Sequence, residues 1–249
     1  MSSWDQLGTA LDAAARRGET IRFWWRDDDA GREHPALSRL MDLAERKAAP
    51  LALAVVPSWL EPQAQGCIAA SAQVTVLQHG FAHANHAGEG AKSIETGGRE
   101  PETVLEELKQ GLGILADAFG AAFLPVLVPP WNRIDAALYP HLETAGYRGL
   151  SVYGTRTAPE ILPGVGLVNT HVDPVDWRGT RGFVGEEAVL QRLIDYLSPD
   201  EPIGLLSHHL VMDESGWTFF EQLFTVLGRH PSARLYPAPY LFERLGSSV

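Results

Sequence analysis

Segments with the patterns of strands and helices alternate about seven times along this chain of 249 residues. The strand segments are apolar on both faces, as in residues 51–56, which are followed by Pro57. Strands that are apolar on both faces are typical of parallel sheets covered by helices. The sequence therefore predicts an α/β fold of parallel strands with crossover helices, either a barrel or a doubly wound sheet.

The expected elements follow from apolar periodicity and from Gly and Pro at their ends. Strands are expected at residues 20–26, 51–56, 74–78, 124–128, 149–153, 167–170, 203–207 and 233–236. The clearest helix begins at Pro101 and ends at Gly120, and further helices are expected at residues 134–145, 186–197 and 214–227. Because no linker, repeat or low-complexity segment interrupts the pattern, we expect residues 1–249 to form a single domain.

Composition excludes several classes of protein. The chain has 20 Lys and Arg against 31 Asp and Glu, a net charge of −11. An acidic chain is a poor binder of nucleic acid or of anionic membranes. No run approaches the ~18 apolar residues of a membrane span, and the first residues lack the pattern of a signal peptide. The single cysteine, Cys67, excludes a disulfide framework and fits a cytoplasmic protein.

In parallel α/β folds, functional residues gather at the carboxyl ends of the strands. A first polar cluster, Arg26 followed by Asp27, Asp28 and Asp29, stands directly after the first expected strand. Three adjacent carboxylates repel one another unless a cation compensates their charge. The cluster is either part of a binding site or a solvated acidic turn that caps the next helix.

A second cluster suggests a metal. His79 and His83 follow the third expected strand and are four residues apart, with His86 nearby. If the segment turns helically, both rings lie on one face at metal-ligand distance. Two histidines together with a carboxylate are the usual ligands of an open catalytic site that holds a divalent metal.

Three more polar clusters follow later strands. The segment 128–133 contains Pro130, Trp131 and Arg133, and is either a rigid turn or a pocket wall with backbone N–H groups aimed inward. The segment 173–177 brings two carboxylates beside a tryptophan, and the segment 206–209 places two histidines at a strand end, where one could act as a general acid or base. The chain lacks a G-x-S-x-G nucleophile motif, a complete dinucleotide loop and a Walker lysine.

The five clusters, in this order, resemble the five motifs of the polysaccharide deacetylase superfamily, the carbohydrate esterase family 4 and its relatives. The resemblance covers residues 21–209. It implies a distorted (β/α)7-type barrel of parallel strands. It also implies a divalent metal bound by one Asp and two His, at which water hydrolyses an N-acetyl group.

The resemblance assigns the metal ligands and the base from the first two motifs. Asp29 matches the metal-binding aspartate, and His79 and His83 match the two histidines, with Gly80 in place of the usual hydroxyl residue. The general base is Asp28 or Asp27. We favour Asp28, and expect Asp27 to pair with Arg26 or Arg133 or to cap the next helix.

The other three motifs imply the remaining site residues. Pro130 and Trp131 match the third motif, which implies that the Trp131 backbone N–H stabilises the oxyanion; the motif's arginine, which normally pairs with the base, is absent, and Arg26 or Arg133 could replace it. The remaining matches are Asp173, Asp176 and Trp177 in the fourth motif, and Leu206 with the general acid His208 in the fifth.

The expected function is therefore hydrolysis of an acyl group, most simply acetyl, from an amide nitrogen of a sugar or small metabolite. The expected cofactor is Zn²⁺, with Co²⁺, Ni²⁺ or Mn²⁺ also compatible. The alternative is a family member without turnover that binds a glycan or metabolite. Nucleic acid and membranes are not expected as partners.

Overall fold

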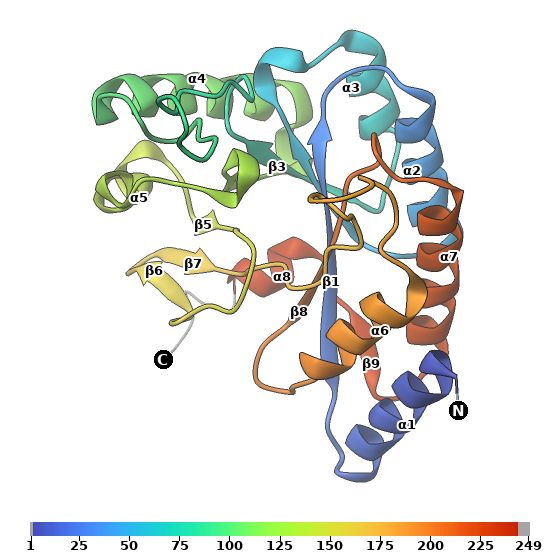
Figure 1. The fold of residues 1–249 in the computed structure, drawn as a ribbon. Coiled ribbons are helices and arrows are strands. Elements are labelled where there is room, and N and C mark those ends of the chain that lie inside the picture. The colour runs from blue at the N-terminus through green and yellow to red at the C-terminus, as the bar shows by residue number, and fades with distance from the viewer. Residues whose placement is uncertain (1, 244–249) are drawn as a thin grey trace.

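The computed structural model describes residues 2–243 and has a mainly parallel sheet surrounded by helices (Figure 1). The strands are β1 (Ile21–Ala30), β2 (Leu51–Val55), β3 (Val74–His79), β4 (Phe123–Val128), β5 (Gly149–Leu150), β6 (Glu160–Leu162), β7 (Val165–Leu167), β8 (Ile203–Ser207) and β9 (Ala233–Leu235). The helices are α1 (Ser3–Arg16), α2 (Pro35–Lys47), α3 (Pro62–Ala69), α4 (Pro101–Phe119), α5 (Leu142–Ala145), α6 (Glu186–Asp195), α7 (Glu214–Arg229) and α8 (Ala238–Glu243).

The sheet order is β6-β7-β5-β4-β3-β2-β1-β8, and β9 pairs with the first residues of β1. All pairs are parallel except β6 with β7. The regular sheet does not close between β7 and β8, but the segment after β7 spans this gap. His171 N–H and Val172 N–H donate to the Gly204 carbonyl, and Leu206 N–H donates to the Val172 carbonyl. The result is a distorted barrel, as the α/β prediction and the resemblance implied.

Apolar side chains fill both sides of the sheet. Inside the barrel, Trp24 and Val126 pack against Leu241 and Phe242 of α8. Outside it, residues such as Phe23 and Trp25 pack beneath the outer helices. Figure 1 shows α2 and α7 along one flank of β1, at the right of the view, and α4 and α5 at its left, beyond β3. These inner and outer layers show which face of β1 points into the barrel and which points toward the outer helices.

Four expected elements differ from the structure. The strand expected at residues 20–26 extends to Ala30, so the three aspartates expected after it lie within β1. Residues 134–145 do not form one helix: a 3-10 segment, Ala136–His141, precedes the short α5. Pro140 lies within that segment, and proline lacks the N–H that a continuous helix needs. The strand expected at 149–153 is limited to Gly149–Leu150. The strand expected at 167–170 instead lies at Val165–Leu167, where it is the second strand of an antiparallel β6–β7 hairpin.

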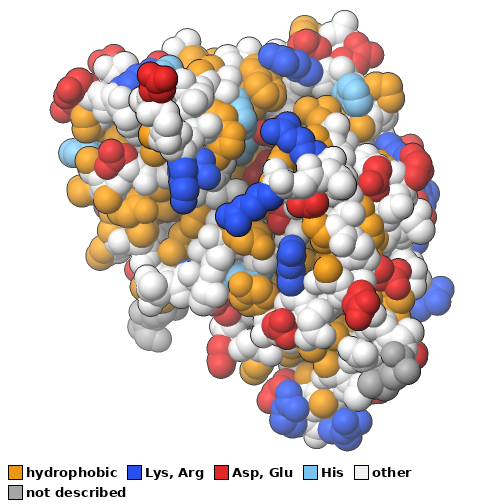
Figure 2. Space-filling view, in the orientation of Figure 1, with side chains coloured by type: hydrophobic (Ala, Val, Ile, Leu, Met, Phe, Trp, Pro, Cys, Tyr) orange, Lys and Arg blue, Asp and Glu red, His pale blue; other side chains and the backbone are white. Residues whose placement is uncertain are grey.

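Charge is unevenly distributed on the face in view. Figure 2 shows Lys and Arg side chains near the middle of this face, and Asp and Glu side chains mainly toward its edges. The excess of 31 acidic over 20 basic residues therefore does not form one acidic patch at the centre of this face. Within residues 2–243, no helix is both long and apolar enough to cross a bilayer.

Candidate metal centre and active site

The three aspartates at the end of β1 point to different sides of the sheet. Side chains alternate along a strand, so Trp25 and Asp27 share one face and Arg26 and Asp28 share the other. Trp25 packs on Phe220 and Phe224 of α7, which places its face toward the outer helices. Asp27 therefore lies outside the barrel, and Arg26 and Asp28 lie inside it.

Asp27 is fully buried and holds the chain that follows β8. Its carboxylate accepts hydrogen bonds from Ser207 Oγ (2.5 Å) and from the backbone N–H of His209 (3.0 Å). His209 Nδ1 lies 2.5 Å from its other oxygen. The expectation that Asp27 pairs with Arg26 or Arg133, or caps α2, is therefore wrong, because strand alternation turns Asp27 away from both arginines. The N-cap of α2 is His34.

Asp28 makes the ion pair with Arg26. Arg26 Nε and Nη2 donate to the two Asp28 oxygens at 2.8 and 2.9 Å, and both side chains are buried. The same guanidinium donates to Ser151 Oγ (2.6 Å), beyond β5, and to Asn132 Oδ1 (2.8 Å), beyond β4. Neither strand is a neighbour of β1, so Arg26 crosses the barrel interior. Arg133 instead donates to the Ser93 carbonyl.

Asp29 departs from the alternation of the strand. Its φ is +71°, and the β1–β2 register shifts between Asp27 and Ala30. The left-handed conformation is uncommon for a residue with a side chain, although aspartate adopts it more readily than most. This irregularity turns Asp29 toward the two histidines instead of leaving it on the Asp27 face.

Asp29, His79 and His83 converge on one point. Asp29 Oδ1 lies 3.1 Å from His79 Nε2 and 3.2 Å from His83 Nε2, and the three candidate ligand atoms all lie within 4.8 Å of one another. His79 Nδ1 is 2.9 Å from the Val128 carbonyl, which favours a proton on Nδ1 and leaves Nε2 free as a ligand. Two imidazoles and one carboxylate are a donor set that fits Zn²⁺ or a similar divalent ion.

The electrostatics of this trio favour a cation. Burial raises the pKa of Asp29, but the hydrogen bonds from His79 and His83 outweigh it and hold the pKa well below its usual range. Burial lowers the pKa of His79, yet its hydrogen bond to Asp29 and the nearby charge of Asp28 raise the pKa overall. The lowered pKa of Asp29 and the raised pKa of His79 both indicate that this site stabilises positive charge.

Trp131 packs against the trio at the end of β4. Its ring centroid is 4.4 Å from that of His83, and its φ of +55° belongs to a tight turn whose first residue, Pro130, is buried. The turn also supplies Asn132, the Arg26 partner. The sequence interpretation missed Asn132 and Ser151, although both are polar residues directly beyond strand ends.

His208 and Asp173 lie together on another side of the site. Trp177 Nε1 donates to Asp173 Oδ2 (2.7 Å), and the Trp177 ring meets the His208 ring edge-on at 4.7 Å between centroids. Burial raises the pKa of Asp173, although the charge of His208 opposes the shift. His208 Nδ1 is buried and has no hydrogen-bond partner within the described part of the chain.

The remaining predicted residues have simpler surroundings. Asp176 accepts backbone N–H bonds from Gly179 (3.0 Å) and Thr180 (3.1 Å) in an exposed turn. Leu206 is buried in β8, next to the strand-end residues. Trp177 is 43% exposed at the rim. Asp173 therefore lies close to His208, whereas Asp176 stabilises the turn at residues 176–180 through its hydrogen bonds.

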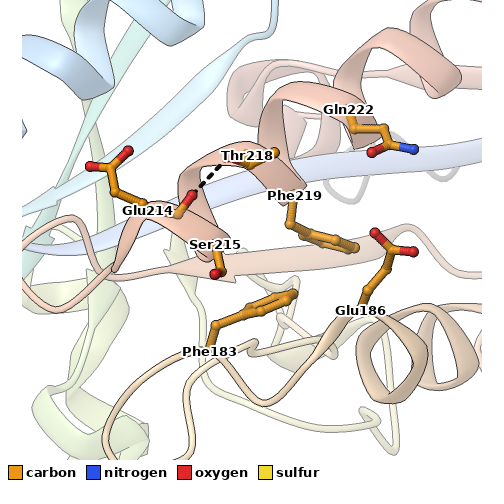
Figure 3. Close-up of a pocket in the computed structure, with 7 residues that line it drawn as sticks. All are labelled: Phe183, Glu186, Glu214, Ser215, Thr218, Phe219 and Gln222. Carbon is orange, nitrogen blue, oxygen red and sulfur yellow. Dashed lines mark hydrogen bonds between the residues drawn. The ribbon is translucent and has the colours of Figure 1, made fainter.

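A separate groove lies among the outer helices. Figure 3 shows it between the segment before α6 and the first turns of α7, with the rings of Phe183 and Phe219 5.3 Å apart between centroids. Its volume is about 310 Å³, and Glu186, Glu214 and Gln222 also line it. It contains none of the residues described above and is not part of the metal centre.

Comparisons with known proteins identify the fold. No protein-family model matches the sequence, and no curated protein matches it significantly. Among solved structures, the Bc1960 peptidoglycan N-acetylglucosamine deacetylase has a TM-score of 0.59 at 16% identity, covering 90% of this chain and 89% of its own. The peptidoglycan deacetylase PdaC from Bacillus subtilis has a TM-score of 0.59 at 13% identity, covering 91% of each chain.

A third similar structure is described as a pseudoenzyme. BA3943 of Bacillus anthracis, from carbohydrate esterase family 4, has a TM-score of 0.57 at 15% identity, covering 90% of this chain and 66% of its own. The fold thus occurs with and without activity, and function has to be argued from the site. This chain has the fold of the polysaccharide deacetylases of carbohydrate esterase family 4.

Proposed function

We propose that this protein is a metal-dependent deacetylase of the polysaccharide deacetylase superfamily. It removes an acetyl or similar acyl group from the amide nitrogen of a sugar or small metabolite. The observation that carries the proposal is the convergence of Asp29, His79 and His83 beside the buried Asp28–Arg26 pair. Zn²⁺ suits these ligands best, and Co²⁺, Ni²⁺ and Mn²⁺ are compatible.

Asp29, His79 and His83 would hold the divalent ion, which would supply Lewis acidity to activate water and polarise the acyl carbonyl. Asp28 is the general base and accepts the proton of the attacking water. The two hydrogen bonds from Arg26 fix its orientation and balance its charge, so Arg26 takes over the role of the missing third-motif arginine. The Trp131 backbone N–H stabilises the developing oxyanion.

The leaving group is protonated on the other side of the site. His208 donates a proton to the departing amine, since an amine leaves readily only when it is protonated. Asp173 lies beside His208, held there by its hydrogen bond from Trp177, whose ring meets the His208 ring edge-on. Trp177, exposed at the rim, contacts the substrate, whereas the buried Leu206 and Pro130 support the site from behind. Arg133 fixes the loop that carries Trp131 through its bond to the Ser93 carbonyl.

The alternative is a binding protein without turnover. The missing third-motif arginine and the pseudoenzyme among the similar structures favour it. The buried Arg26–Asp28 pair opposes it, because the base has an arginine partner from another position. An intact set of ligands, base and acid favours the enzyme.

A chelation experiment tests the proposal. Protein stripped with a chelator should release no acetate from N-acetylglucosamine or its oligomers, and one equivalent of Zn²⁺ or Co²⁺ should restore release. Acetate is measured with a coupled assay, and Mg²⁺ serves as a control because it prefers oxygen ligands. Acetate release that chelation does not change would contradict the metal mechanism. Glycan binding without acetate release at any metal loading would favour the alternative.

A further inference from the structure

Glu95 is a buried carboxylate that no motif assigns. It lies in the segment between β3 and α4 and is 2% exposed. Its Oε1 accepts the backbone N–H groups of Ala82 (2.7 Å) and Ala84 (3.2 Å), and its Oε2 accepts that of Phe81 (3.1 Å). A carboxylate is costly to bury unless hydrogen bonds compensate it, and these three do.

Those three N–H groups belong to the turn that carries His83. The φ of His83 is +54°, a region that residues with side chains rarely occupy. Such a conformation persists only when its surroundings enforce it. The bonds from Glu95 to Ala82 and Ala84 fix the backbone on both sides of His83 and therefore enforce its conformation.

Gly80 provides the space for this carboxylate. A Cβ atom built on Gly80 would lie 1.9 Å from Glu95 Oε2, so no other residue fits there while Glu95 keeps its place. The glycine that stands where the second motif has a hydroxyl residue is thus coupled to Glu95. The segment that carries Glu95 is itself anchored, since His86 N–H donates to the Ile94 carbonyl and Thr96 Oγ1 donates to the Arg133 carbonyl.

We propose that Glu95 is a positioning residue of the metal centre, which holds His83 in its ligand orientation before the ion arrives. This inference rests on the metal centre of the proposed function. Because the ligand is preorganised, binding need not order the turn, and affinity rises accordingly. Groups that orient metal ligands typically contribute 10–100-fold to affinity.

The test measures the Zn²⁺ dissociation constant by competition with a chromophoric chelator. Glu95→Ala removes both acceptor oxygens, and with them all three hydrogen bonds, and should weaken binding about 10–100-fold. Glu95→Gln retains one acceptor oxygen, so its dissociation constant should fall between those of the wild type and of Glu95→Ala. Asp213→Ala is the matched control, since Asp213 also accepts two backbone N–H groups, from Gly216 and Phe183, but caps α7 and makes none of the bonds that hold the His83 turn. The control should bind Zn²⁺ like the wild type.

Each outcome decides the matter. Folded Glu95→Ala protein with the wild-type dissociation constant would overturn the inference, and so would an equal loss in Asp213→Ala. If Glu95→Ala does not fold, Glu95→Gln decides, because it keeps the bulk of the side chain. Wild-type protein that binds no Zn²⁺ would overturn the proposed function itself. If the wild type binds Zn²⁺ and both Glu95 variants bind it equally well, only the role of Glu95 is overturned.

Discussion

At the scale of residues, three consecutive aspartates have three different partners. Asp27 bonds to Ser207 and His209 outside the barrel, Asp28 to Arg26 inside it, and Asp29 to the two histidines. Because side chains alternate along a strand, Asp27 and Asp28 point to opposite faces of the sheet. Asp29 has a positive φ and does not follow this alternation. The division of roles follows from backbone geometry.

This division predicts different effects for two isosteric variants. Asp28→Asn removes the proposed base and should lower kcat by about 10²–10⁴-fold while the metal content stays unchanged. Asp27→Asn disturbs a buried network and should lower the free energy of unfolding by about 1–3 kcal/mol. Acetate release, elemental analysis and urea unfolding distinguish them. Loss of activity in Asp27→Asn without loss of stability would show that the assignment of the base is wrong.

The sequence could predict which residues meet but not all of their pairings. Polar residues after parallel strands converge by topology, so the aspartate cluster and the pair His79 and His83 could be expected near one another, whereas the choice of Asp29 as the ligand came from the resemblance. Whether the strand stays extended through Asp29 depends on a bulge that no residue pattern specifies. Glu95 was not predictable, because it reaches the His83 turn through a segment without helix or strand, which has no periodicity to interpret.

At the scale of elements, helix α4 is tied to strand β3, which carries His79. The Gln78 side chain donates to the carbonyls of Gly80 (2.9 Å) and Leu108 (3.0 Å). Gly111 permits this approach, because a Cβ there would lie 2.3 Å from Gln78 Nε2. Tyr147 donates to the same Leu108 carbonyl (3.2 Å). Strong Pro and Gly signals made α4 predictable, whereas these contacts depend on packing.

The buried Tyr147 predicts an alkaline loss of stability. Burial raises the pKa of Tyr147 well above its usual value, near 10. Above pH 10 the unfolded chain releases this proton and the folded chain keeps it. The stabilisation is therefore complete below pH 10 and declines above it, by at most about 1.4 kcal/mol per pH unit. The difference between the wild type and Tyr147→Phe in urea unfolding should shrink from pH 8 to pH 11. If the difference in the free energy of unfolding stayed constant over this pH range, the predicted loss of stabilisation by Tyr147 would be wrong.

At the scale of the whole molecule, the sheet brings the site residues together at its strand ends, although its regular strand pairing does not close between β7 and β8. The segment after β7 bridges to β8, and this brings Asp173 and Trp177 next to His208. Alternating strands and helices predicted an α/β fold, and motif order indicated the barrel. The β6–β7 hairpin was not foreseen, because three-residue strands carry too little pattern.

If Asp29, His79 and His83 hold one divalent ion, elemental analysis of the purified protein and of two variants will show it. The wild type and the control His86→Ala, a histidine of the same segment outside the trio, should each carry one equivalent of metal. The double variant His79→Ala/His83→Ala should carry almost none while it remains folded. A full equivalent in the double variant would contradict the account.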